Sequence, residues 1–246
     1  MPAIQKHHPS ILETTLDLPL AIEIASNGFL EAPGNDSTAN LRRFKFIHPD
    51  AIRYLRRFNY DWVDFGLEVL SPVLAKEIAA WKVGGMSFAD GMATYSEALC
   101  CFDHSQTSLT FEDISDALDL QSAAALGRGM RFLSFSTTHL SPQIAELIAR
   151  HLGWLQIKLN QPISPESMQM LASHIGEQVV LHLKQPITTE LLMPLIQNSA
   201  IRYIHLNGLF LSRQYESALL LCKQSRYIEI MMDIDLTSAM AFGPIF

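Results

Sequence analysis

The strongest constraint on the fold of this chain is an internal repeat. Short segments in which apolar and polar residues alternate recur along most of the chain, and each is followed by apolar residues three and four positions apart. The first pattern has the period of a strand with one buried face, and the second has the period of an amphipathic helix. The central apolar residue of each predicted strand recurs every 23 or 24 residues, at Phe65, Phe88, Phe111, Phe135, Leu159, Leu183, Leu206 and Ile230.

A second landmark, the apolar residue just before each predicted helix, keeps nearly the same period. In the clearest cases, such as Leu140 and Ile163, it is followed by Ser and then Pro. A Ser or Thr side chain accepts a hydrogen bond from an amide of the first helical turn, and Pro at the first helical position has no amide to leave unpaired. The landmark residues are Leu70, Met92, Ile114, Leu140, Ile163, Ile187, Leu211 and Leu236, with Ile47 as a weaker ninth. One strand and one helix per unit at this period predict a solenoid.

The chain resembles the leucine-rich repeat family in an irregular, degenerate form. The best unit, Ile201-x-x-Ile204-x-Leu206-x-x-Leu209, follows the family pattern LxxLxLxxN except at its last position. The family's Asn ladder is absent, because that position is occupied by Ile114, Thr138, Pro162, Pro186 and Leu209. The resemblance covers roughly residues 60 to 236. It implies an α/β leucine-rich-repeat-like solenoid, a horseshoe with a parallel β-sheet on the concave face and helices on the convex face.

The repeat also suggests a division of the chain. Residues 59–246 are predicted to form a solenoid of about eight units. Residues 1–58 are predicted to be its N-terminal cap, because the terminal unit of a solenoid would otherwise leave apolar surface in water. Partial disorder of residues 1–40 is an alternative. The apolar tail 240–246 is interpreted as a cap that folds back, with packing on a second molecule and truncation of the chain as alternatives.

Charge and composition exclude several classes of function. A net charge of −7 argues against binding to nucleic acid or to an anionic membrane, since both require a basic field. No stretch approaches eighteen apolar residues, so no membrane span is predicted. The first residues lack the basic and apolar segments of a secretory signal. Cys100, Cys101 and Cys222 have neither disulfide nor metal spacing, which indicates free thiols and a reducing compartment. A cytoplasmic location is therefore predicted, with export as an effector without a classical signal peptide as an alternative.

The function is expected on the sheet face that points away from the helices. Side chains between the buried anchors point onto this face, and those of adjacent strands form rows about 4.8 Å apart. The central row is predicted to run Asp64, Ser87, Thr110, Ser134, Lys158, His182, His205, Glu229. Aromatic side chains with polar tips beside charges are typical of a protein-binding patch, although strand propensity alone also places them on solvated faces. The predicted partner-binding residues of the C-terminal half are Lys158, Asn160, His182, Lys184, Tyr203, His205, Asn207, Tyr227 and Glu229.

Three of these residues form a candidate metal site. His182, His205 and Glu229 would lie on neighbouring strands of one row, close enough to share an ion. Structural zinc sites draw on close local spacings that are missing here, so hydrogen bonding along the row or to a partner is the favoured interpretation. The hydroxyls of Ser134 and Thr110 lie too many strands away to act as nucleophiles with these imidazoles. No metal, no cofactor and no catalytic residue is predicted.

Four large or titratable side chains are predicted to be structural. Trp81 and Trp154 stand at helix-to-strand junctions, where a large ring would fill the gap between the layers. His151 and His174 come late in their predicted helices, where a cationic imidazole would suit the helix C-terminus.

These patterns favour a noncatalytic scaffold for protein–protein recognition. In bacteria, the resemblance implies a host-directed effector or an intracellular adaptor. One alternative is a structural subunit that assembles through residues 240–246. Another is a regulatory subunit of an enzyme, in which the solenoid positions the chemistry of its partner.

Overall fold

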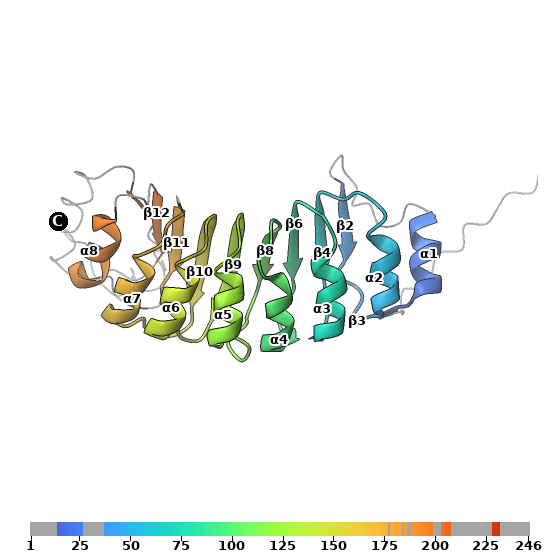
Figure 1. Ribbon diagram of the computed structural model, residues 1–246, viewed down its shortest axis with the longest axis horizontal. Helices are drawn as coiled ribbons and strands as arrows, with labels where there is room; N and C mark the ends of the chain where they lie inside the picture. Colours follow the sequence, from blue (N-terminus) through green and yellow to red (C-terminus); the bar gives the residue numbers. More distant parts are fainter. Residues whose placement is uncertain are drawn as a thin grey trace, which may run out of the picture.

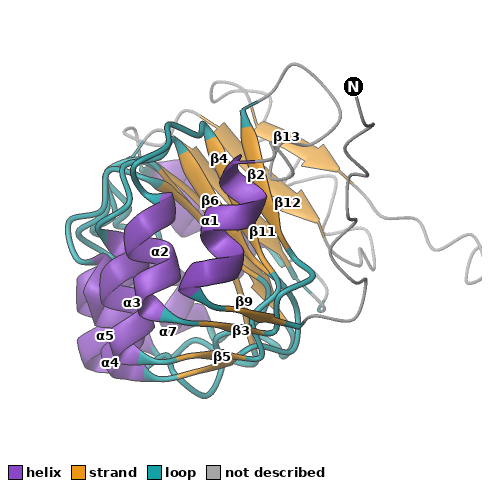
Figure 2. Cartoon of the chain, turned by 90° about the vertical axis from the view of Figure 1, so that its right-hand side faces the viewer, coloured by secondary structure: helices purple, strands orange, loops and turns teal. Residues whose placement is uncertain are grey.

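A computed structural model describes residues 14–26, 37–176, 178–183, 185, 188–198, 203–207 and 228–231. In this part of the chain one large parallel sheet is covered on one face by a row of helices (Figure 1, Figure 2). From edge to edge its nine strands are β2 (Thr38–Leu41), β4 (Trp62–Phe65), β6 (Gly85–Phe88), β8 (Ser108–Phe111), β9 (Phe132–Thr137), β10 (Trp154–Leu159), β11 (Gln178–His182), β12 (Tyr203–Asn207) and β13 (Ile228–Met231). The predicted α/β class with a parallel sheet is confirmed.

Helices follow the strands of the large sheet in chain order, and each described helix packs against the next. They are α1 (Leu18–Ser26), α2 (Pro49–Leu55), α3 (Pro72–Ala79), α4 (Ser96–Leu99), the 3₁₀ turn η1 (Cys100–Phe102), α5 (Leu120–Leu126), α6 (Pro142–Ile148), α7 (Pro165–Leu171) and α8 (Thr189–Gln197). Two short parallel pairs join β1 (Thr15–Leu16) to β3 (Phe46–Ile47) and β5 (Val69–Leu70) to β7 (Ala93–Thr94). Strand β2 belongs to the large sheet although its residues fall inside the predicted cap 1–58. None of the described helices is long and apolar enough to cross a membrane.

Four of the described helices begin at the predicted capping residues. The side-chain oxygens of Ser71, Ser141, Ser164 and Thr188 each accept a hydrogen bond from the amide three residues later. In α3, α6 and α7 the next residue is Pro. The local sequence therefore sets where these helices start.

Two predicted helix starts were wrong. The residues after Met92 form the short strand β7, and α4 begins only at Ser96. The residues after Ile114 form a turn, and α5 begins after Asp119, whose carboxylate accepts hydrogen bonds from two amides of the first turn. Neither predicted start has a Pro at the next position, so the apolar residue followed by Ser or Ala was too weak a signal.

The core between sheet and helices contains a stack of phenylalanines. Phe65, Phe88 and Phe111 pair in register on adjacent strands, with ring centroids 5.2 and 4.8 Å apart and nearly parallel planes. Phe135 continues the register on β9 and is also buried. Three successive strands of the sheet therefore each contribute one ring to the stack.

The predicted row of buried anchors is displaced in two strands. Phe135 pairs with Ile157, and Ile157 pairs with Leu181, so the predicted anchors Leu159 and Leu183 lie two residues too far along their strands. All four aliphatic side chains are buried, which explains the error. Because the side-chain period of a strand is two, a slip of two residues keeps every side chain on its face, and alternation alone cannot detect it.

Two buried imidazoles and one half-buried amide side chain link the ends of successive helices. Nδ1 of His151 lies 3.0 Å from the carbonyl oxygen of Leu126, the last residue of α5. In the next unit Nδ1 of His174 lies 3.2 Å from the carbonyl oxygen of Ala149, and in the unit after that the Asn198 amide donates to the carbonyl of Ala172 over 2.6 Å. Each side chain thus bonds to a carbonyl at the C-terminal end of the preceding helix, where no further helical turn supplies an amide.

The two imidazoles are not the cations that the sequence predicted. Both are buried, and burial lowers the pKa of His151 and lowers that of His174 to about 4. Both rings are therefore neutral at neutral pH. Burial outweighs the attraction between a cation and the helix C-terminus, because the free-energy cost of an unpaired charge in the core exceeds the stabilisation that the helix end provides.

The phenylalanine stack predicts a large loss of stability on truncation. Phe88→Ala removes the middle ring of the three and leaves a cavity, so we expect the free energy of unfolding to fall by about 3–5 kcal/mol. Urea unfolding followed by circular dichroism measures this difference. Tyr95→Ala, which truncates an exposed aromatic side chain, is the matched control and should cost less than about 0.5 kcal/mol. Equal effects of the two variants would contradict the role given to the stack.

The buried His174 predicts a loss of stability in mild acid. In the unfolded chain this histidine titrates near pH 6.5, whereas its folded-state pKa is about 4. Between these values the unfolded state binds more protons. The contribution of His174 is therefore complete above about pH 6.5 and is lost as the pH falls, by about 1.4 kcal/mol per pH unit. Urea unfolding of wild type and His174→Asn across this range measures the slope, which should be shallower in the variant. His139→Asn, an exposed control, should keep the wild-type slope. Identical slopes for wild type and His174→Asn would contradict the account.

Candidate functional site: the open face of the parallel sheet

The large sheet has one open face, because the described helices all lie against the other (Figure 2). On β10, for example, Leu155 and Leu159 are buried under the helices, whereas Trp154 and Lys158 are exposed on the opposite side. We call this surface the open face. It consists of the side chains that alternate with the buried ones along each strand.

The central row of the open face differs from the predicted one. Among the described side chains it runs in register through Asn40, Asp64, Ser87, Thr110, Ser134, Gln156 and Val180, and the backbone pairing continues to His205 and Glu229. The prediction placed Lys158 and His182 in this row. They lie instead in the adjacent row, where Lys158 pairs with Ser136 and His182 pairs with Asn207. The error has the same origin as the displaced anchors, a slip of two residues between β9 and β10.

Three of the predicted partner-binding residues have described side chains. Lys158 is exposed, whereas Asn160 and His182 are half-buried. The side-chain nitrogen of Gln156 on β10 lies 3.1 Å from Nε2 of His182 on β11, a diagonal contact between adjacent strands. This contact holds the imidazole against the neighbouring strand. Of these three side chains, only that of Lys158 is exposed to a partner.

The other predicted residues are placed by backbone register alone or lie outside the described residues. Tyr203 pairs with Gln178, His205 with both Val180 and Glu229, and Asn207 with His182. Lys184 and Tyr227 lie outside the described residues, as does the apolar tail 240–246.

The register separates the three residues considered for a metal site. His205 lies opposite Glu229, but His182 lies opposite Asn207, two residues further along β12 than His205. The predicted placement of all three in one row was therefore wrong. Within the described part of the chain no three His, Cys, Asp or Glu residues are grouped closely enough to hold a metal ion.

The prediction that Trp154 is a core residue was also wrong. Trp81 is buried as expected, but Trp154 is 54% exposed at the start of β10. It pairs with Phe132 on β9, and the two rings form part of an apolar hollow on the open face. The signal was in the sequence: Trp154 is in phase with Gln156 and Lys158. The displaced register concealed the place of Trp154 on the open face.

The hollow beside Trp154 is lined mainly by apolar side chains. We call it the apolar hollow and define it by Met130, Phe132, Leu152 and Trp154; Ser108, Arg131 and Gly153 complete its lining, and its volume is about 440 Å³. Clusters of exposed large apolar side chains mark sites of interaction with proteins or ligands. The apolar hollow therefore extends the predicted site beyond its polar residues.

At the opposite end of the open face, polar groups are satisfied within the chain. The indole nitrogen of Trp62 donates to Asp64 over 2.9 Å, and the Ser87 hydroxyl donates to the same carboxylate oxygen. Arg42 pairs with the other oxygen at 3.6 Å. The ring of Trp62 occupies the space where a side chain at Gly85 would stand. The polar groups at this end thus already have contacts within the chain, and few remain available to a partner protein.

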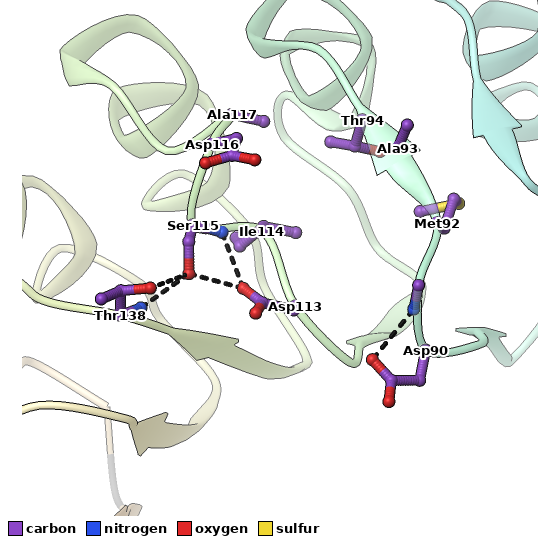
Figure 3. A pocket seen from close by; sticks show the side chains of 11 residues that line it. Asp90, Met92, Ala93, Thr94, Asp113, Ile114, Ser115, Asp116, Ala117 and Thr138 are labelled. Atoms are coloured by element: carbon purple, nitrogen blue, oxygen red, sulfur yellow. Dashed lines mark hydrogen bonds between the residues drawn. The ribbon is translucent and has the colours of Figure 1, made fainter.

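A second hollow of about 510 Å³ lies where the strands give way to the loops before the helices (Figure 3). Its walls include Asp90 and Asp113. Both carboxylates stabilise turns: Asp90 accepts from the Gly91 amide, and Asp113 accepts from the amide and hydroxyl of Ser115, whose hydroxyl oxygen also accepts from Thr138 (Figure 3). These contacts explain the carboxylates as structural, so we assign no function to this hollow.

The two cysteines that the structure describes are free, in line with the prediction. Cys100 and Cys101 are half-buried, and burial raises the pKa of both thiols. Their thiols are therefore poor nucleophiles at neutral pH. Cys222 lies outside the described residues.

Comparison of the chain with protein-family models, with curated proteins and with solved structures gave no match.

Proposed function

We propose that this chain is a noncatalytic scaffold that binds a partner protein on the open face around β9 to β12. The observation that supports it best is Trp154, a tryptophan left 54% exposed beside Phe132 on an otherwise regular sheet. Tryptophan is among the residues that contribute most to protein interfaces, and leaving it in water has a cost that a partner would remove. Lys158, on the same strand and the same face, adds a charge that a partner can reach.

The architecture that we propose for this scaffold is a leucine-rich-repeat-like solenoid of about eight units. On this proposal the parallel sheet lines the concave face and the helices form the convex face. Support comes from the order of the strands, which follows the chain from β2 to β13, and from the single row of helices (Figure 1). The two adjacent free thiols, Cys100 and Cys101, fit a protein of a reducing compartment such as the cytoplasm.

A matched pair of double variants tests the proposed face. Trp154→Ala with Lys158→Glu changes the open face, and Val73→Ala with Lys76→Glu makes comparable changes on the exposed side of α3. The partner captured from cell lysate by wild type should bind the open-face variant about thirtyfold more weakly, since interface hot spots contribute about 2 kcal/mol or more. The helix-face variant should bind as wild type does.

Unfolding in urea shows that both variants are folded before their affinities are compared. A partner that binds the folded open-face variant as tightly as wild type, and is lost by the helix-face variant, would contradict the proposal and move the site to the helices.

A further inference from the structure

The apolar hollow is unusual in how much large apolar surface it leaves exposed. Met130, Leu152 and Trp154 are 46%, 51% and 54% exposed, and all three line it together with the half-buried Phe132. Fully burying one such side chain contributes about 1.5–3 kcal/mol. Three of them around one depression therefore form a site where an inserted apolar group would gain substantial binding energy.

The backbone around the apolar hollow is fixed by contacts between successive units. The Leu152 amide donates to the Gly129 carbonyl, and the Met130 amide donates to the Ser105 carbonyl, each over 3.0 Å. A Cβ at Gly153 would overlap the carbonyl group of Arg131, so only glycine lets the two units approach this closely. The lining side chains thus project from strand starts and tight turns that are already in place, which lowers the entropic cost of binding.

The charge beside the apolar hollow indicates the chemistry of its occupant. Arg131 lines it and is exposed. Two nearby arginines are held by carboxylates: Arg128 forms two bonds of 2.6 and 2.7 Å to Asp103, and Arg150 bonds Glu146 over 2.9 Å. Among the described residues no carboxylate forms an ion pair with Arg131. An unpaired guanidinium next to an apolar depression is complementary to a carboxylate next to an apolar side chain.

We infer that the apolar hollow binds a peptide segment of the partner protein in which a large apolar residue stands next to Asp or Glu. The apolar side chain enters between Trp154 and Leu152, and the carboxylate pairs with Arg131. This inference rests on the proposed recognition function and adds the chemistry of the recognised segment.

Selection from a random peptide display library on the immobilised full chain tests the inference. Enriched peptides should share a large aliphatic or aromatic residue adjacent to Asp or Glu. Synthetic versions of these peptides should bind the Trp154→Ala variant, and separately the Met130→Ser variant, at least about tenfold more weakly than wild type, because each variant removes part of the lining. The peptides should also bind Arg131→Gln about tenfold more weakly than wild type, whereas they should bind the matched surface variant Arg150→Gln as tightly as wild type. Replacing the acidic residue of the peptide by its amide should abolish the effect of Arg131→Gln.

The other outcomes separate this inference from the function on which it rests. Peptides that lose affinity for Lys158→Glu but bind the Trp154, Met130 and Arg131 variants normally would overturn the inference and leave open-face recognition in place. Peptides that bind every variant as they bind wild type would contradict both. Enrichment of basic peptides, or of none, would overturn the inference. So would a wild-type dimer that Trp154→Ala converts to monomer, because a second copy of the chain would then occupy the apolar hollow.

Discussion

The structure depends on the in-register pairing of one strand from each unit with the strand of the next. This pairing aligns the buried rings of Phe65, Phe88 and Phe111 in contact, and each unit thereby completes the core of the unit before it. Parallel strands require a crossover between them, and the described helices within these crossovers lie on the same face. No described helix covers the opposite face of the sheet. The candidate site exists because the packing that stabilises the fold uses only one side of each strand.

The sequence predicts whether a segment forms a strand or a helix better than it predicts the register of each strand against the next. Capping residues such as Ser141 and Ser164 locate helix starts, because their hydrogen bonds are local. Register between strands is set by packing across units and by loop lengths. Strand β10 has three buried aliphatic residues in alternation, any of which could oppose Phe135. The choice of Ile157 displaced two predicted anchors and concealed Trp154, the residue on which the proposed site now depends.

The positions of the predicted site residues follow from the same displaced register. A slip of two residues preserves the face, so Lys158, Asn160 and His182 were correctly predicted to avoid the core, but their neighbours were not those expected. The contacts of His151 and His174 could not be read from the sequence at all. Their carbonyl partners belong to the preceding unit, and no local pattern distinguishes a buried imidazole from one at an exposed helix end.

Two regions of the open face differ in how their polar and aromatic groups are used. Near β4, Trp62 and Asp64 are engaged with neighbours in the chain, whereas near β10 Trp154 and Lys158 face solvent. This asymmetry is the physical basis for placing recognition toward the C-terminal half. It also suggests that the stacked core and the binding surface can be altered independently, since their side chains lie on opposite faces of the same strands.

Site-specific photocrosslinking tests the central claim most directly. A photoreactive residue at Gln156 lies in the middle of the open face, and one at Val73 lies on the exposed side of α3. The account predicts that a partner protein in cell lysate is crosslinked from position 156 and not from position 73. Crosslinking from position 73 alone would contradict it and assign recognition to the helices.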